Sequence, residues 1–414
     1  MCQASERVID NIIGSSARLP FPPRALPCRH SIKPDGCPPP PPFSEEPLQV
    51  RRQKAGRGRN DAPEERQKDA KKTNGIRYVA RDPLPPRALF LNAARLDYDK
   101  KLDLSRLSSL TELICNDVDI VRDVEEIVDL VEKARPEIVI TKEMEIPSSA
   151  LERFPNSVRL LCEAGTGYNN IPVDMARSRG MDVVNIPTYS TDSVAHMVIT
   201  YVMSFSAALF DQARMLHDGD RRNFTESFRH PIQEIRGKTL GMIGGSGTIG
   251  TAVTDVALPL GMNVLVSSRS KALPPGHKYE DEPRVSIVPL DDLLERSDFV
   301  SVNCPLNAQT RHLLGDREIR LMKPTAFLIN TARGGVINEA ELIECMKEGV
   351  IAGAGLDTQE EEPPPEESEI WSLPNVFLTP HIGWRRLETR QRLVDMTADN
   401  IEAYTRGETT NIVN

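Results

Sequence analysis

Gly241-Met-Ile-Gly-Gly-Ser-Gly-Thr-Ile-Gly250 is the stretch of sequence from which the fold can be inferred. It contains the end of a short apolar run, 240–243, and opens a segment with helical periodicity. Glycines in a G-x-G-x-x-G pattern permit a tight turn, close approach of the backbone to a pyrophosphate and close helix packing, while the helix N-terminus offers free N–H groups to the phosphates. The residues of this predicted nucleotide site are Gly245, Gly247, Thr248, Ile249 and Gly250. The alternatives are an ordinary glycine-rich turn and, because Gly244 precedes Gly245, a different register of the pattern.

Short apolar runs alternate with helical segments on both sides of this stretch. On the C-terminal side, the predicted strands are 240–243, 263–266, 299–303, 326–330, 353–357 and 376–378. On the N-terminal side, the predicted strands are 88–91, 112–115, 137–141, 159–163 and 182–185, with helices at 124–133, 148–154 and 173–179. A long helix, 191–216, connects the two groups, and a helix at 385–406 closes the chain. Because the strands alternate with helices and lack hairpin turns, the predicted fold class is α/β with two doubly wound parallel sheets.

The first 75 residues differ in composition from the rest of the chain. They hold 14 Lys and Arg residues against 9 Asp and Glu, whereas the whole chain holds 51 against 60, for a net charge of −9. Of the 33 prolines, 15 lie within the first 86 residues. Such a stretch cannot bury enough apolar surface to offset the entropy lost on ordering, so we predict a disordered, basic, proline-rich tail over 1–75. Acidic residues follow its basic cluster at 51–59 closely, which favours a solvated linker over a nucleic-acid-binding segment.

The seven cysteines are scattered and never spaced as a CxxC pair. This spacing argues against a metal site and against a disulfide framework, and it indicates a reducing compartment. The longest apolar run, 194–210, is interrupted by polar residues and predicts a buried helix rather than a membrane span. We therefore expect a cytoplasmic protein with neither a membrane nor a nucleic acid as partner; import into an organelle, suggested by the basic residues of 11–34, is the alternative.

The turn after the strand 263–266 bears on the choice of dinucleotide. NAD-binding chains usually present an acidic residue about 20 positions after the glycine pattern, whereas NADP-binding chains offer an arginine to the 2′-phosphate. Here the strand runs into Ser267-Ser268-Arg269-Ser270-Lys271, which contains no carboxylate. Ser268 and Arg269 predict a preference for NADP(H), with NAD(H) as the other cofactor to consider. The alternative interpretation is a solvated loop.

Five further stretches carry a more specific pattern. They are Asn185-Ile-Pro-Thr-Tyr-Ser-Thr-Asp-Ser-Val-Ala195, Gly237-Lys-Thr-Leu-Gly241, Leu328-Ile-Asn-Thr-Ala-Arg-Gly-Gly335, Ala352-Gly-Ala-Gly-Leu-Asp357 and Leu378-Thr-Pro-His-Ile-Gly383. With them, residues 89–411 resemble the D-isomer-specific 2-hydroxyacid dehydrogenases, particularly the glyoxylate/hydroxypyruvate reductase and glycerate dehydrogenase branch. The resemblance implies a discontinuous, flavodoxin-like substrate domain, 84–190 completed by 382–414, and a Rossmann dinucleotide-binding domain, 191–381.

Three side chains are the predicted catalytic residues. Arg333 can form a bidentate pair with a 2-oxo carboxylate, and His381 can donate a proton in reduction and accept one in oxidation. In the family, a carboxylate lies five residues after the strand-ending aspartate and before a proline; the resemblance therefore selects Glu362 from three consecutive glutamates. A carboxylate beside His381 favours the imidazolium. Asp357, by resemblance, lies near the nicotinamide carboxamide, with a strand-end cap as the alternative.

The resemblance extends to further binding residues. The loop 164–170 looks like the substrate loop of the family, with Gly165, Thr166 and Gly167 beside the carboxylate. The remaining predicted cofactor contacts are Thr191, Cys304, Pro305 and Thr331. Trp384 stands where many relatives have a small residue and either lines the substrate pocket or packs in the core. His196, where many relatives have Glu or Gln, receives no role.

These residues predict an oxidoreductase that transfers a hydride between NADP(H) and a small 2-oxo or D-2-hydroxy acid, such as glyoxylate or hydroxypyruvate. The alternative is a dinucleotide-regulated, corepressor-like binding protein of the same fold, which Trp384 and the basic tail favour and the absence of an acidic residue after the second strand disfavours. The resemblance implies a homodimer formed through the helix 191–216. Removal of residues 1–75 is expected to leave activity intact.

Overall fold

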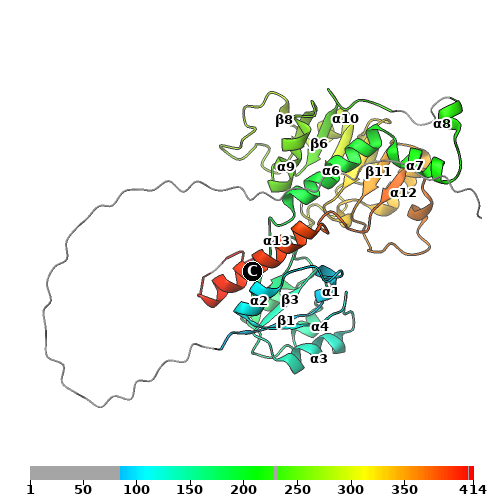
Figure 1. The fold of residues 1–414 in the computed structure, drawn as a ribbon. Helices are drawn as coiled ribbons and strands as arrows, with labels where there is room; N and C mark the ends of the chain where they lie inside the picture. Colours follow the sequence, from blue (N-terminus) through cyan, green and yellow to red (C-terminus); the bar gives the residue numbers. More distant parts are fainter. Residues whose placement is uncertain (1–83, 227–231, 409) are drawn as a thin grey trace, which may run out of the picture. The chain divides into compact units, whose positions relative to one another are not determined.

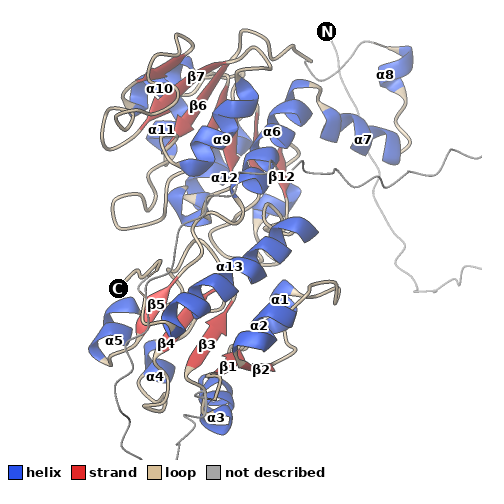
Figure 2. Cartoon of the chain, turned by 60° about the vertical axis from the view of Figure 1, so that its left-hand side comes forward, coloured by secondary structure: helices blue, strands red, loops and turns tan. Residues whose placement is uncertain are grey.

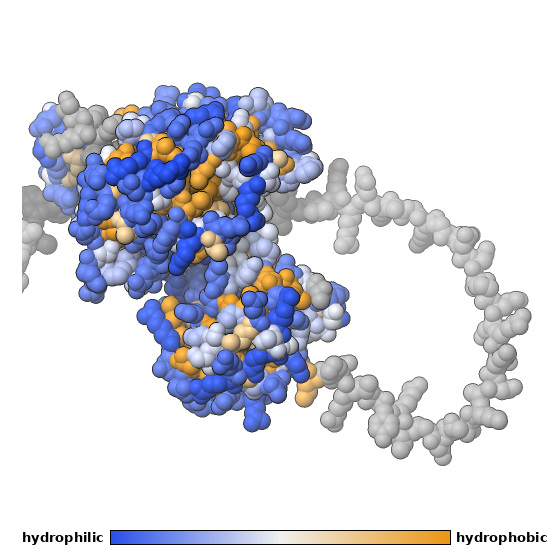
Figure 3. All heavy atoms as spheres, turned by 180° about the vertical axis from the view of Figure 1, so that it is seen from behind, coloured by the Kyte–Doolittle hydropathy of each residue, from blue (hydrophilic) through white to orange (hydrophobic). Residues whose placement is uncertain are grey.

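The computed structural model describes residues 84–226, 232–408 and 410–414 (Figure 1). The predicted disordered tail, 1–75, lies outside the described residues. The described chain contains two parallel sheets with helices against both faces of each, as the alternation of strands and helices predicted (Figure 2). On the face drawn in Figure 3, hydrophobic side chains form patches within a largely hydrophilic surface.

The N-terminal group of strands forms a five-stranded sheet. Its strands are β1 (Arg87–Phe90), β2 (Glu112–Cys115), β3 (Ile138–Thr141), β4 (Leu160–Glu163) and β5 (Asp182–Val184). They are parallel throughout and lie in the order β2-β1-β3-β4-β5, which is the flavodoxin-like order. Leu89 of β1 pairs with Ile114 on one side and Val139 on the other. All five strands were predicted from the sequence.

Helices cover both faces of this sheet, and one of them comes from the end of the chain. The helices are α1 (Ala93–Leu96), α2 (Ser105–Leu110), α3 (Val124–Ala134), α4 (Ser148–Leu151), α5 (Val173–Ser178) and α13 (Leu387–Thr405). In α3, Asp123 caps the N-terminus by accepting from the Glu126 amide, and Ile127 and Val131 face the core. Leu393 and Ile401 of α13 share a core with Phe90, so the closing helix packs on the first sheet.

The C-terminal group of strands forms a seven-stranded sheet. Its strands are β6 (Thr239–Ile243), β7 (Asn263–Ser267), β8 (Val285–Ile287), β9 (Phe299–Val302), β10 (Phe327–Asn330), β11 (Gly353–Leu356) and β12 (Val376–Leu378). The order is β12-β11-β10-β9-β6-β7-β8, and every pair is parallel. The sequence prediction missed β8, because this short edge strand has a polar, exposed residue, Ser286, between two partly buried ones and offers no apolar run.

The helices of the second sheet also lie on both of its faces. They are α6 (Thr191–Ser206), α9 (Thr248–Ala257), α10 (Leu290–Arg296), α11 (Asp316–Leu321) and α12 (Glu339–Glu348), with α7 (Leu209–His217), α8 (Arg222–Thr225) and the 3-10 turns Gly334–Val336 and Glu369–Ser372 beside them. Side chains of α6 and α9 share one core with β6 and β7. Those of α10, α11 and α12 share another core on the opposite face.

The predicted continuous helix 191–216 is wrong in one respect, because the chain breaks between α6 and α7. The carbonyl of Ser206 accepts the amide of Gln233, and Ala208 adopts a left-handed conformation with φ 48°. The two helices are consequently bent by 65° relative to each other. In the described part of the chain, no single helix is long and apolar enough to cross a membrane, and only α6 and α7 counted together reach the required length.

Candidate active site

A cavity of about 500 Å³ lies at the carboxyl ends of strands from both sheets, where ligands of parallel sheets bind. Its lining contains eleven of the predicted site residues: Gly165, Thr166, Gly167, Ile249, Cys304, Pro305, Thr331, Arg333, Asp357, His381 and Trp384. Eight predicted residues do not line it: Thr191, Gly245, Gly247, Thr248, Gly250, Ser268, Arg269 and Glu362. The fold thus gathers residues that are more than 200 positions apart in the sequence around one space.

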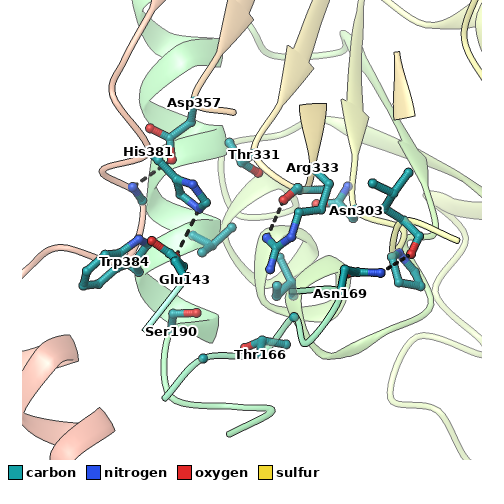
Figure 4. Close-up of a pocket in the computed structure, with 18 of the residues that line it drawn as sticks. Glu143, Thr166, Asn169, Ser190, Asn303, Thr331, Arg333, Asp357, His381 and Trp384 are labelled. Atoms are coloured by element: carbon teal, nitrogen blue, oxygen red, sulfur yellow. Dashed lines mark hydrogen bonds and ion pairs between the residues drawn. The ribbon is translucent and has the colours of Figure 1, made fainter. Parts of the chain in front are cut away.

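His381 and Glu362 form a hydrogen-bonded pair at the edge of this cavity. The distance from His381 Nδ1 to Glu362 Oε2 is 2.9 Å. The other ring nitrogen, Nε2, lies 3.6 Å from Glu143 Oε1 (Figure 4). Of the three consecutive glutamates, Glu360 instead pairs with His312 at 2.6 Å. Glu362 is therefore the glutamate of the three that contacts the imidazole, and its role in orienting His381 stays a prediction.

Asp357 holds the turn that carries His381. Its buried carboxylate accepts the amides of Ile382 and Gly383, each at 2.8 Å, and the hydroxyl of Thr379 at 2.6 Å. The amide of His381 donates to the Asp357 carbonyl at 2.9 Å. Both carboxylate oxygens of Asp357 thus bind the turn, as expected for a strand-end cap. Asp357 also lines the cavity.

Arg333 follows β10 and points at the predicted substrate loop. The side chain of Asn330 holds its loop by donating to the Arg333 carbonyl at 2.9 Å and accepting the Ala332 amide at 3.1 Å. A Cβ atom added at Gly167 would lie 1.9 Å from Arg333 Nη2, so the guanidinium rests directly on the loop backbone. Within the described residues, Arg333 forms no ion pair, and its charge is available to an anion in the cavity.

The glycine loop between β6 and α9 fits a dinucleotide. Gly244 takes the positive φ of 80° that the turn requires, and a Cβ at Gly250 would lie 2.2 Å from the Gly245 carbonyl oxygen. At Gly247, the N-cap of α9, a Cβ would meet only the Gly244 carbonyl oxygen, at 3.8 Å, which leaves the backbone open to a phosphate. These environments support the register Gly245-x-Gly247-x-x-Gly250, with Gly244 as the turn residue.

Two orphaned buried atoms in the same cavity also suit a polar cofactor. Thr331 Oγ1 and Asn303 Oδ1 are buried and lack a hydrogen-bond partner within the described residues, although both residues line the cavity. Buried polar groups without partners are costly, and a ligand that pairs with them removes the cost. Ser268 and Arg269 lie farther out, in the exposed turn after β7, where Arg269 Nη1 is 3.4 Å from Gln309 Oε1.

Sequence reasoning missed an ion pair that directly follows β3. Lys142 Nζ lies 2.7 Å from Glu143 Oε1, and both residues line the cavity. Burial alone would raise the pKa of Glu143, but the charges of Lys142, His381 and Arg95 outweigh burial and hold this pKa well below its usual range. The signal that could have identified the pair is its position, because Lys142 and Glu143 are polar residues at the carboxyl end of a buried strand.

Other residues complete the site description. Trp384 packs in the core of the first sheet and also lines the cavity, and its contact with substrate stays a prediction. His196 is exposed on α6 and lies outside the cavity lining. No group of three or more His, Cys, Asp or Glu side chains in the part of the chain that the structure describes could hold a metal ion.

Comparison with known proteins identifies the family. Residues 199–383 match the family model "D-isomer specific 2-hydroxyacid dehydrogenase, NAD binding domain". A hydroxypyruvate reductase from Blautia hydrogenotrophica is 33% identical over 315 residues, which cover 76% of this chain and 95% of that protein. A glycerate dehydrogenase from Methylorubrum extorquens is 33% identical over 293 residues, which cover 70% of this chain and 88% of that protein.

A solved structure shows the same arrangement of the chain. It is an NADPH-dependent glyoxylate/hydroxypyruvate reductase from Sinorhizobium meliloti in complex with NADP and malonate, with a TM-score of 0.66 and 26% identity, over 79% of this chain and 96% of that one. The chain belongs to the D-isomer specific 2-hydroxyacid dehydrogenase family of NAD(P)-dependent oxidoreductases.

Proposed function

We propose that this protein reduces a small 2-oxo acid, such as glyoxylate or hydroxypyruvate, to the D-2-hydroxy acid with NADPH. The observation that carries the proposal is the convergence of Arg333, His381 and the loop 165–167 on one cavity, with Glu362 bound to His381. The names of the relatives support this substrate class.

In the proposed reaction, Arg333 and the backbone N–H groups of 165–167 hold the substrate carboxylate, and the guanidinium polarises the keto oxygen. Glu362 accepts from Nδ1 of His381, so Nε2 donates the proton that the forming alkoxide needs. When bound, NADPH supplies the hydride. In the oxidative direction, His381 accepts the proton from the hydroxyl group of the D-2-hydroxy acid.

Absorbance at 340 nm tests this function directly. Purified protein is incubated with NADPH or NADH and with glyoxylate, hydroxypyruvate or pyruvate, and the oxidation of the cofactor is followed. We expect turnover with at least one of these acids. Absence of turnover with all of them would contradict the proposal and favour a protein that binds a dinucleotide without catalysis.

We also propose a preference for NADP(H), which Arg269 and Ser268 would provide at the turn after β7. Arg269→Ala is expected to raise KM for NADPH roughly 10- to 100-fold, because a hydrogen bond to a charged group contributes about 1.5–3 kcal/mol. KM for NADH should change less than threefold. Arg296→Ala, which removes an exposed arginine at the end of α10, is the control and should leave both values unchanged. A wild-type enzyme with a higher kcat/KM for NADH would contradict the preference.

Finally, we propose that the protein is a homodimer that uses α6, α7 and α8. Large hydrophobic side chains are exposed along this part of the chain: Met203, Leu209, Leu216, Phe224 and Ile232. Large apolar side chains exposed on neighbouring segments are candidates for a protein interface. Sedimentation velocity should show a species of twice 46.1 kDa, and the double variant Leu209→Glu/Leu216→Glu should shift it toward the monomer. A monomeric wild type at micromolar concentration would contradict the dimer.

A further inference from the structure

The ion pair of Lys142 and Glu143 has no part in the reaction described so far. The Lys142 side chain is 1% exposed, and its Nζ lies 2.7 Å from Glu143 Oε1, 3.3 Å from Tyr189 Oη and 3.9 Å from the centre of the Trp384 ring. All four residues line the cavity. Removing two opposite charges from water is costly, and such a pair inside a ligand cavity is a candidate for substrate recognition.

The Lys142–Glu143 pair borders the position that the assigned contacts leave for the third carbon of a 2-oxo acid. The carboxylate of such an acid is assigned to Arg333 and the loop 165–167, and its keto oxygen to Nε2 of His381. Glu143 Oε1 lies 3.6 Å from this same Nε2 (Figure 4). Lys142 Nζ borders the substrate loop, since a Cβ atom added at Gly165 would lie 3.4 Å from it. A substituent on C3, one bond from the keto carbon, would therefore meet Glu143 and Lys142.

The charges at this position indicate what kind of substituent fits. Arg95 Nη2 lies 3.2 Å from Glu143 Oε2, and Lys142 Nζ lies 2.7 Å from Oε1, so each carboxylate oxygen already has one cation. Glu163, behind the pair, accepts from Thr141 at 2.8 Å and from the Glu143 amide at 3.0 Å. With its cations already matched by carboxylates, the cluster offers no unpaired positive charge to a second substrate carboxylate. Glu143 can accept a hydrogen bond from a neutral hydroxyl group, because a carboxylate oxygen has more than one lone pair.

We propose that the Lys142–Glu143 pair determines substrate specificity by hydrogen bonding a hydroxyl group on C3 of the 2-oxo acid. Glu143 accepts from this hydroxyl, and Lys142 holds Glu143 in place through an ion pair shielded from water by Trp384 and Tyr189. The inference rests on the proposed function and narrows it to 3-hydroxy-2-oxo acids, of which hydroxypyruvate is the smallest. A 2-oxo acid with a methyl group on C3 leaves the acceptor of Glu143 unused, and one with a carboxylate there meets Glu143 as a like charge.

The wild-type enzyme provides the first test, which no folding defect can obscure. We expect kcat/KM for hydroxypyruvate to exceed that for pyruvate at least about tenfold, because the two acids differ by this hydroxyl group alone. Oxaloacetate should be a poorer substrate than hydroxypyruvate. A wild-type enzyme whose kcat/KM for pyruvate or oxaloacetate equals that for hydroxypyruvate would overturn this inference. The proposed function would still stand. An enzyme that turns over no 2-oxo acid would overturn both.

The second test replaces the pair by apolar side chains of similar size. In Lys142→Met/Glu143→Leu, the ratio of kcat/KM for hydroxypyruvate to that for pyruvate should fall at least about tenfold relative to the wild type. The matched control is Arg390→Met/Asp99→Leu. It replaces the ion pair between α13 and the loop after α1, which has an N–O distance of 2.8 Å and lies outside the cavity lining, and it should leave the ratio unchanged. Thermal unfolding of both variants reports on stability. A ratio that stays within twofold of the wild-type value in the folded Lys142→Met/Glu143→Leu enzyme would overturn the inference.

Discussion

Replacement of His381 by asparagine will lower kcat for 2-oxo acid reduction about 10²–10⁴-fold, the range in which a positioned general acid acts. Asparagine can still hydrogen bond to Glu362 but cannot deliver a proton from the position of Nε2. The turn itself should survive, because Asp357 holds the backbone amides of residues 382 and 383 independently of the His381 ring. Steady-state rates at 340 nm with NADPH in saturating amount measure the loss.

Two further measurements separate a chemical loss from a structural one. The dissociation constant for NADPH, from its fluorescence, should change less than threefold in His381→Asn, because this side chain is assigned to the substrate. His312→Asn is the matched control, since His312 also pairs with a glutamate, Glu360, but lies outside the cavity lining. A decrease of only two- or threefold in kcat for His381→Asn would show that the proton comes from another group.

Replacement of Arg333 by lysine will lower kcat/KM for the 2-oxo acid about 10²-fold, since one of two hydrogen bonds to a charged carboxylate is lost and such a bond contributes about 1.5–3 kcal/mol. Lysine keeps the positive charge but cannot form two parallel hydrogen bonds to a carboxylate. The comparison therefore tests whether geometry, beyond charge, is required. Arg320→Lys, on the surface helix α11, is the control and should have no effect.

Gly167→Ala provides an independent test of the same contact from the opposite side. The added methyl group would lie 1.9 Å from Arg333 Nη2, so the guanidinium must move. We expect kcat/KM for the acid to fall at least about tenfold while KM for NADPH changes little, because displacement of a positioning group weakens alignment. Full activity in both Arg333→Lys and Gly167→Ala would show that the substrate carboxylate binds elsewhere.

Local sequence patterns predicted most of the fold. Buried strands such as β3 and β9 consist of four consecutive buried residues, so their apolar runs are visible without any knowledge of their neighbours. The edge strand β8 has no such run, and its pairing with β7 is what makes it a strand. At the break between α6 and α7, the Ser206 carbonyl accepts the amide of Gln233 from a distant part of the chain, and no periodicity within the helix could reveal this contact.

Some residues of the candidate site could likewise be identified from the sequence, and others could not. Arg333 and His381 lie in short motifs that the family resemblance could identify, and the glycine loop could be recognised from its spacing alone. The spacing from Asp357 singled out Glu362 among three consecutive glutamates. In the structure, Glu362 is the one that contacts His381, at 2.9 Å. Lys142 and Glu143 belong to no motif that was recognised, and they become neighbours of His381 only because β3 and the turn after β12 end at one cavity.

The chain order of most strands and helices, the glycine loop and the candidate reacting side chains could be predicted from the sequence, since each prediction depends on residues within a few positions of one another. Distances across the cavity could not, because they are set by the packing of elements up to about 240 residues apart. Tertiary packing is what brings the Lys142–Glu143 pair against His381, rests Arg333 on Gly167 and buries Trp384 over Lys142. We expect these contacts to govern which 2-oxo acid can bind, because specificity depends on the shape and charge of a cavity that no single segment forms.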